Sequence, residues 1–596
     1  MIGVVTGQAP SSPYLAEVLA HAGLSWRALR TAELDGDGPP ERVLVLPAAA
    51  ALPAAARDRL VGFVRQGGAL VALGGTAGLD DLLGVADADP PGTLDEGYLA
   101  LDSRHPLTAG LTSSLHIFGA ARLRATAGTS LGCLLGVDRR PTGADAVVVH
   151  RAGRGVAVTI AADLPAAILR IQQGRPIDRD GEPAPDGTAA IDDGILKTDD
   201  GVVLSWAFDR ERTPLADPAP ECPGLHPDFP RGDTPWFARP IADELRMLLL
   251  RAICWAAARV GVCLPALWYW PRGLPAVGLI SHDSDHNIDR SARTTLALLE
   301  RAGIASTWCD AWSPVWPASY SAETHALVRA AGHEIALHYN ARPEDGGAWG
   351  EVPLRDQLAW LRRETGVERV ASNKNHYLRW EGEVEFFRWL EAVGIPSDQS
   401  KGPSKKGNVG YPHGSCQPWF PYDAERGRFL DVLEIPLQTQ DLWLTAPYAI
   451  AGPILEQSRR HHGVAHFLFH QVHLHHRPEV AAALLQVVAD GRARGLEWWT
   501  GAAINDWERR RRAIAVTCAP VGDRGILLRA HAPDALPGAT LALLPPAGSG
   551  VGAAPAAVCD GQPVVLRAGE FHGLPALFCD VDLAAGTTVV EVRWPA

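Results

Sequence analysis

Short apolar runs that alternate with helical patterns place the strongest constraint on how this chain can fold. Strands are expected at residues 1–5, 42–47 and 69–75, with amphipathic helices at 13–23 and 56–68 between them. A strand–helix–strand rhythm of this kind requires a parallel sheet with helices on its faces. The predicted fold class is therefore α/β.

The same rhythm returns later, and two other patterns separate or follow the α/β parts. Residues 171–267 form an irregular connector rich in Pro, Gly and Asp, which ends in a strong helix at 242–261. After residue 510, short strands alternate with Gly, Pro and Asp, as is typical of a small β-sandwich. We therefore expect an α/β domain at 1–170, the connector at 171–267, a barrel at 268–509 and a β-sandwich at 510–596.

Charge and cysteine spacing exclude several classes of function. The chain has 596 residues and a net charge of −13, whereas proteins that grip nucleic acid need a basic face. Nine cysteines are scattered without a CxxC pair, which fits neither a disulfide framework nor a cysteine zinc site. No apolar window reaches the ~18 residues of a membrane span, and the start lacks a leader pattern. We expect a cytoplasmic protein without nucleic-acid or membrane partners, and leave open whether it is a homo-oligomer.

Polar side chains follow several of the apolar runs in the barrel segment. SHDSDHN (281–287) comes directly after LPAVGLI (274–280), and His338, His376 and His470 also stand where a strand gives way to a loop. In a parallel barrel, all strands open with their carboxyl ends on one face, so these groups should converge. A carboxylate and two imidazoles can bind a Zn²⁺-like ion and leave one position open. The alternative is a hydrogen-bonded acidic turn.

The order LISHDSD, GHEIALH, FLFH and GLEWWT resembles the polysaccharide deacetylases with NodB homology, carbohydrate esterase family 4, over about residues 270–507. This resemblance implies a distorted (β/α) barrel and a hydrolase of non-peptide carbon–nitrogen bonds. Such an enzyme removes acyl groups from N- or O-acylated carbohydrate by attack of metal-bound water. The implied cofactor is one divalent ion, with Zn first and Co, Mn, Ni or Fe as alternatives.

The first 170 residues resemble the class I glutamine amidotransferase-like domains, which are flavodoxin-like α/β domains. The resemblance rests on LVALGG (70–75), which stands where those domains carry a nucleophile elbow. Thr76 follows the glycines, and no Cys or Ser occupies the elbow. We therefore expect a domain without catalysis of its own.

The deacetylase resemblance also assigns roles to single residues. Asp283 matches the catalytic base, Asp285 a metal ligand, His338 the first ligand histidine and His470 the general acid. If the strand continues through them, positions 283 and 285 point the same way.

One position departs from the family pattern, because Arg342 stands where a second ligand histidine is usual. His376 is our candidate for the missing ligand, and Lys374 or Arg379 could orient Asp283. A glycine-rich loop could offer backbone N–H groups to an oxyanion, and two tryptophans could line a sugar cleft. The predicted substrate-binding residues are Trp380, His413, Gly414, Ser415 and Trp419.

Two other functions compete with the carbohydrate deacetylase. The same fold could hydrolyse carbon–nitrogen bonds of small molecules, which would suit a soluble intracellular substrate. Alternatively, the chain could be a non-catalytic carbohydrate-binding scaffold, which Arg342 favours and the retained Asp283, Asp285 and His470 oppose.

Overall fold

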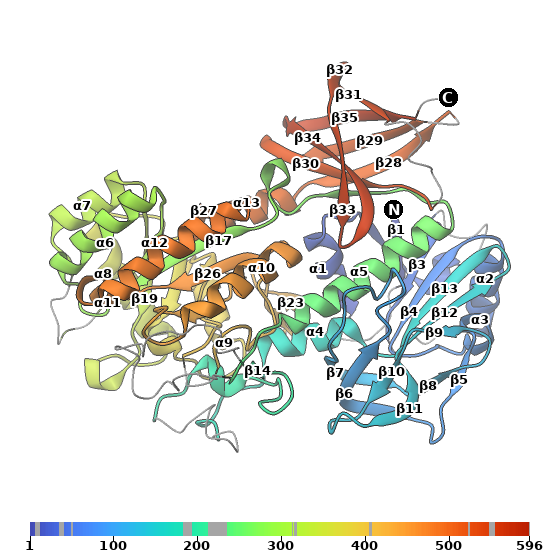
Figure 1. Ribbon diagram of the computed structural model, residues 1–596, viewed down its shortest axis with the longest axis horizontal. Helices are drawn as coiled ribbons and strands as arrows, with labels where there is room; N and C mark the ends of the chain where they lie inside the picture. The colour runs from blue at the N-terminus through green and yellow to red at the C-terminus, as the bar shows by residue number, and fades with distance from the viewer. Residues whose placement is uncertain are drawn as a thin grey trace. The chain divides into compact units, whose positions relative to one another are not determined.

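The computed structural model places most of the chain in regular elements (Figure 1). It describes residues 1–5, 12–34, 41–48, 52–182, 194–212, 235–312, 314, 319–404, 408–522, 525–547 and 555–594. Parts of the predicted connector lie outside these residues. The chain divides into two compact units, one made of residues 1–169, 244–273 and 509–596, the other of 170–243 and 274–508.

The first unit contains the parallel sheet expected at the start of the chain. Helices α1 (Ser12–His21) and α2 (Ala54–Arg65) connect its strands. The sheet has seven strands, in the order β2 (Trp26–Leu29), β1 (Ile2–Val5), β3 (Val43–Leu46), β4 (Ala69–Leu73), β13 (Gly155–Ile160), β12 (Val147–Ala152) and β9 (Thr129–Ser130). The strands from β2 to β13 pair in parallel, which confirms the α/β prediction for this segment. Its kinship with amidotransferases stays a prediction.

A second sheet in this unit was not predicted. It has six antiparallel strands, in the order β5 (Val85–Asp87), β8 (Leu123–Ala125), β11 (Pro141–Asp145), β10 (Gly132–Leu135), β6 (Thr93–Leu101) and β7 (Leu115–Ala121). The strands are hard to recognise because charged and glycine residues interrupt them; β6, for example, begins with the exposed or half-buried residues TLDE.

The C-terminal residues of the first unit form strands of two antiparallel sheets. The five-stranded sheet runs β28 (Ala515–Val521), β29 (Gly525–Ala532), β35 (Gly586–Arg593), β31 (Ala556–Cys559) and β32 (Gln562–Val564). The four-stranded sheet runs β16 (Leu264–Leu267), β30 (Leu536–Leu544), β34 (Leu574–Leu583) and β33 (Leu566–Phe571). Strand β16 follows helix α5 (Ile241–Arg259) and pairs with β30. The predicted connector, residues 171–267, therefore contributes a strand to this region. No helix of the described residues, α5 included, is long and apolar enough to cross a bilayer.

The second unit is built on a nine-stranded sheet in which every pairing is parallel. Eight strands follow one another in the order β24 (Leu433–Glu434), β21 (Ser397–Asp398), β20 (Ser372–Asn375), β19 (Glu334–Tyr339), β18 (Thr307–Ala311), β17 (Val277–Asp283), β26 (Val464–Leu468) and β25 (Thr439–Gln440). The ninth, β27 (Glu497–Trp499), pairs with the first half of β17.

One extended segment joins the two ends of this sheet. Leu433 and Glu434 pair with β21, and a few residues later Thr439 and Gln440 pair with β26. The segment from Leu433 to Gln440 therefore runs from one edge strand of the sheet to the other, while the distorted barrel stays a prediction. The helices around them are α6 (Asp289–Ala302), α7 (Ala322–Ala330), α8 (Glu351–Thr365), α9 (Glu385–Val393), α10 (Ala451–His461), α11 (Gln471–His476), α12 (Pro478–Ala493) and α13 (Gly501–Arg512).

Apolar side chains pack between these strands and helices. Trp308 and Leu337 from the sheet lie in one core with Leu358 and Leu361 of α8. A parallel sheet that is covered by helices buries the side chains along its strands. Polar side chains are therefore expected where the strands end, at their carboxyl ends.

Candidate metal centre

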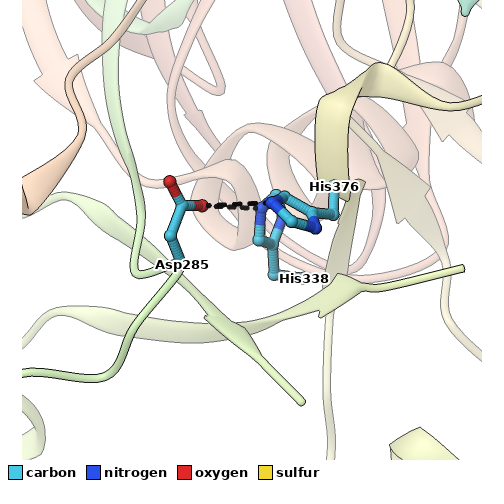
Figure 2. Close-up of side chains that lie close together, drawn as sticks. All are labelled: Asp285, His338 and His376. Atoms are coloured by element: carbon cyan, nitrogen blue, oxygen red, sulfur yellow. Dashed lines mark ion pairs between the residues drawn. The ribbon is translucent and has the colours of Figure 1, made fainter. Parts of the chain in front are cut away.

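Three side chains that the sequence assigned to a metal ion come together at the carboxyl ends of β17, β19 and β20 (Figure 2). Oδ1 of Asp285 lies 3.4 Å from Nε2 of His338 and 3.7 Å from Nε2 of His376. Asp285, His338 and His376 each offer one ligand atom, and these atoms lie within 4.8 Å of one another.

The two aspartates reach the site in a different way from the one we expected. Strand β17 ends at Asp283, and Asp285 lies beyond it in a left-handed conformation with φ 49°. A tight turn, in which the N–H of His286 donates to the carbonyl of Ser284, replaces the extended strand. Both carboxylates still face His338, with Oδ2 of Asp283 lying 3.6 Å from its Nε2.

A hydrogen bond to Nδ1 fixes the ring of His338. Its Nδ1 donates to the carbonyl of Lys374 at 2.9 Å, so in the neutral ring Nε2 keeps the lone pair for a cation, and this nitrogen lies beside Asp285. Nε2 of His338 and Oδ1 of Asp285 are buried and have no hydrogen-bond partner. Burial lowers the pKa of His338, but Asp283 and Asp285 outweigh it and raise the pKa above its usual value. The site therefore attracts a positive charge, and a divalent cation fits the unsatisfied atoms.

His376 completes the set from a 3-10 turn that follows β20. Its Nδ1 is 3.1 Å from Oδ1 of Asn340, which leaves Nε2 facing Asp285. Burial lowers the pKa of His376 to about 4, so the imidazole is neutral at neutral pH, the form that binds metals.

The second carboxylate, Asp283, has a buried cation beside it. Nζ of Lys374 lies 3.5 Å from Oδ1 of Asp283 and donates a hydrogen bond to Ser281. Arg379, the other candidate for this role, instead bonds the carbonyl of Ala341 at 2.7 Å and pairs with Glu381. Lys374 is therefore the residue placed to orient Asp283.

On the other side of the site, His470 is held by an aspartate that the sequence reasoning missed. Asp441 accepts two hydrogen bonds from His470, one from its Nδ1 and one from its backbone N–H at 2.8 Å. It also accepts a bond from Nδ1 of His473 at 2.8 Å. Nε2 of His470 points towards Asp285, 3.8 Å from its Oδ2. Burial opposes protonation of His470, but Asp441 and Asp285 outweigh it and raise its pKa to about 10. His470 could therefore supply a proton from Nε2 at this side of the site.

The Asp441 cluster could also be considered as a second metal site, because its three ligand atoms lie within 4.8 Å. However, Nδ1 of His470 and Nδ1 of His473 both bond the same carboxylate oxygen. This arrangement satisfies the carboxylate with N–H donors, so we interpret it as support for a proton donor.

The predicted substrate-binding residues are buried in the second unit. Trp380 and Trp419 are fully buried in the core that includes Phe387. Ser415 donates to Asp243 at 2.7 Å, Gly414 lies against Ile171 and Ala242, and His413 is 2% exposed. These contacts are those of a packed interior, and a role of the five residues at a substrate surface stays a prediction.

Comparison with known proteins gives distant structural neighbours only. No protein-family model and no curated protein matches the sequence. The carbohydrate deacetylase Agd3 aligns with 100% of this chain and 98% of its own, at 9% identity and a TM-score of 0.41. A protein from Mycobacterium smegmatis assigned as a polysaccharide deacetylase aligns with 41% of this chain and 93% of its own, at 17% identity and a TM-score of 0.31.

A β-galactosidase from Rahnella sp. R3 is also similar, at 16% identity and a TM-score of 0.23, over 27% of this chain and 28% of that enzyme. This chain therefore spans less than a third of that enzyme's length. The structural neighbours thus include carbohydrate deacetylases.

Proposed function

We propose that this protein is a metal-dependent hydrolase that removes acyl groups from N- or O-acylated carbohydrate. One observation supports the proposal: three side chains that could hold a metal ion lie between a carboxylate and a histidine with a raised pKa. Asp285, His338 and His376 form the ligand set, with Asp283 3.6 Å from His338 and His470 3.8 Å from Asp285.

The proposed chemistry follows from the positions of these groups. A bound divalent ion would polarise the acyl carbonyl and lower the pKa of water at the site. Asp283, oriented by Lys374, accepts a proton from the attacking water. His470, oriented by Asp441, donates the proton on Nε2 to the departing nitrogen or oxygen. A carbon–oxygen bond forms and the acyl carbon–nitrogen or ester bond breaks, giving a carboxylic acid and an amine or alcohol.

The carbohydrate substrate is supported by the order of the motifs around Asp283, His338 and His470. The test is release of acetate from N-acetylated aminosugar oligomers, measured beside release from small acetamides, after removal of metal and reconstitution with Zn²⁺, Co²⁺ or Mn²⁺. We expect acetate from the oligomers, and its loss in Asp283→Asn with the metal retained. Release from small amides alone would favour the small-molecule hydrolase. Binding of oligomers without acetate release would favour the scaffold.

A further inference from the structure

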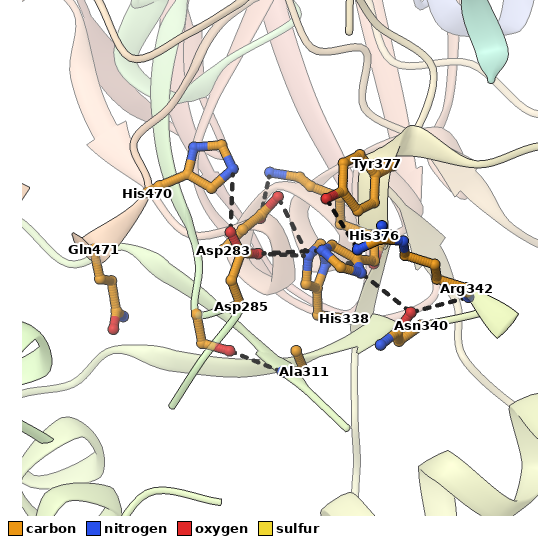
Figure 3. Close-up of polar contacts among 12 residues, drawn as sticks. Asp283, Asp285, Ala311, His338, Asn340, Arg342, His376, Tyr377, His470 and Gln471 are labelled. Carbon is orange, nitrogen blue, oxygen red and sulfur yellow. Dashed lines mark hydrogen bonds and ion pairs between the residues drawn. The ribbon is translucent and has the colours of Figure 1, made fainter. Parts of the chain in front are cut away.

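The turn that carries His376 has an unusual backbone. Tyr377 and Leu378, the two residues that follow His376, have φ values of 60° and 51°. The left-handed region is sparsely populated by residues with a side chain, and such residues persist where their surroundings hold them. The turn directs the end of β20 so that the imidazole of His376 faces Asp285 (Figure 3).

Asn340 holds the imidazole from the side opposite Asp285. Its Oδ1 accepts from Nδ1 of His376 at 3.1 Å and from the backbone N–H of Arg342 at 3.0 Å. Its Nδ2 donates to the carbonyl of Trp312 at 3.2 Å and to Asp345 at 3.3 Å. Because the amide is bonded at both ends, its oxygen is fixed towards His376. The ring is therefore held in the tautomer that keeps Nε2 for a metal ion.

The backbone of Asn340 is fixed as well. Its N–H donates to Oε1 of Gln357 at 2.9 Å, and its carbonyl accepts from Nε2 of Gln357 at 2.6 Å. Both residues are buried. This pair of bonds fixes the loop after β19 and therefore the position of the Asn340 side chain.

Tyr377 connects this arrangement to position 342. Its ring centroid lies 4.4 Å from that of His376, and the Arg342 guanidinium carbon lies 5.3 Å from the Tyr377 ring. Nη1 of Arg342 is 3.5 Å from the Tyr377 hydroxyl. Arg342, which stands where the resemblance leads one to expect a ligand histidine, thus packs on the turn that supplies His376.

We infer that Asn340 and Tyr377 are positioning residues that make His376 the third metal ligand, with Arg342 supporting Tyr377. The inference rests on the proposed metal site. It explains how a metal site can persist with arginine at position 342, because the ligand comes from the end of β20 instead of from the loop after β19.

The experiment measures Zn²⁺ affinity by competition with a chromogenic chelator, and the absorption spectrum of the Co²⁺ form. Removing an outer partner of a ligand histidine typically weakens metal binding about 10–100-fold, which is the result expected for Asn340→Ala. The double variant Asn340→Asp with Asp345→Asn exchanges donor and acceptor across the 3.3 Å contact and keeps an acceptor for His376, although it loses the bond to the carbonyl of Trp312. We expect it to restore most of the affinity.

Two substitutions at Tyr377 separate its ring from its backbone. Tyr377→Gly accepts the left-handed conformation readily but lacks the ring, whereas Tyr377→Ala lacks the ring and is also strained. We expect affinity to fall from wild type to Tyr377→Gly and further to Tyr377→Ala. His475→Ala is the matched control for metal binding by a histidine outside the site, since His475 bonds Thr294 on α6 at 2.7 Å. This variant should bind Zn²⁺ as tightly as the wild type does. Circular dichroism checks that each variant folds.

The outcomes separate this inference from the proposed function. Wild-type affinity in folded Asn340→Ala and Tyr377→Ala, with weak binding in His376→Ala, would overturn the inference and leave the metal hydrolase standing. Wild-type affinity in His376→Ala would overturn the ligand assignment and the inference together. The expected losses of affinity in a protein that releases no acetate would support the inference and refute the function.

Discussion

Replacing Asp441 with asparagine should change how the stability of the metal-free protein depends on pH. The pKa of His470 rises from 6.5 to about 10, because Asp441 and Asp285 together outweigh burial. At about 1.4 kcal/mol for each pH unit, this preference for the protonated form corresponds to about 5 kcal/mol. The side chain of His470 is 17% exposed, so solvent screens only part of the interaction.

The sign follows from linkage. The folded protein binds the proton on His470 more tightly than the unfolded chain does, so the stabilisation is complete below about pH 6.5. It is lost progressively as the pH rises towards 10. Asp441→Asn removes the nearest counter-charge, and loss of one partner of a buried pair costs about 3–5 kcal/mol. We therefore expect the variant to lose most stability near pH 6 and much less near pH 10.

Urea unfolding at pH 6, 8 and 10 measures this difference. Asp490→Asn is the matched control, because Asp490 accepts a hydrogen bond from Tyr448 at 2.9 Å and contacts neither histidine. A constant difference between Asp441→Asn and the wild type at all three values of pH would refute the argument from His470.

Three further predictions follow. Lys374→Met leaves Asp283 buried without its cation, so the free energy of unfolding should fall by about 3–5 kcal/mol. Acyl hydrolysis should be lost in this variant, while elemental analysis should still find the metal. Adding Zn²⁺ at about 100 times its dissociation constant should stabilise the metal-free protein by about 2.7 kcal/mol in urea unfolding, and His338→Ala should not respond. Trp380→Ala should lower stability by about 3–5 kcal/mol, since the ring is fully buried; an unchanged unfolding midpoint would contradict its place in the core.

Much of this arrangement could be predicted from where polar residues follow apolar runs. Asp283, Asp285, His338 and His376 were expected to lie together because each stands near the end of an expected strand, and in a parallel sheet those ends share one face. Asp441 was missed although it obeys the same rule. The strand before it, Thr439–Gln440, has only two residues and no apolar run to mark it.

Other features could not be read from local patterns. Trp380 and Trp419 were proposed as cleft walls, but a tryptophan in the sequence looks the same whether its ring packs in a core or faces a ligand. The pairing of Leu264–Leu267 with the C-terminal strand Leu536–Leu544 joins residues more than two hundred and fifty positions apart, and no local periodicity records it. The choice between Lys374 and Arg379 likewise depended on which side chain reaches Asp283 in space.

The most direct test of the central claim is the metal content of the purified protein after dialysis against Zn²⁺, measured by elemental mass spectrometry beside Asp285→Ala, His338→Ala and His376→Ala. The three ligand atoms lie within 4.8 Å of one another, so we predict one tightly held ion per wild-type chain and its loss or marked weakening in each variant. A wild-type protein that holds no ion, or variants that hold as much as the wild type, would contradict the metal site and the hydrolase built on it.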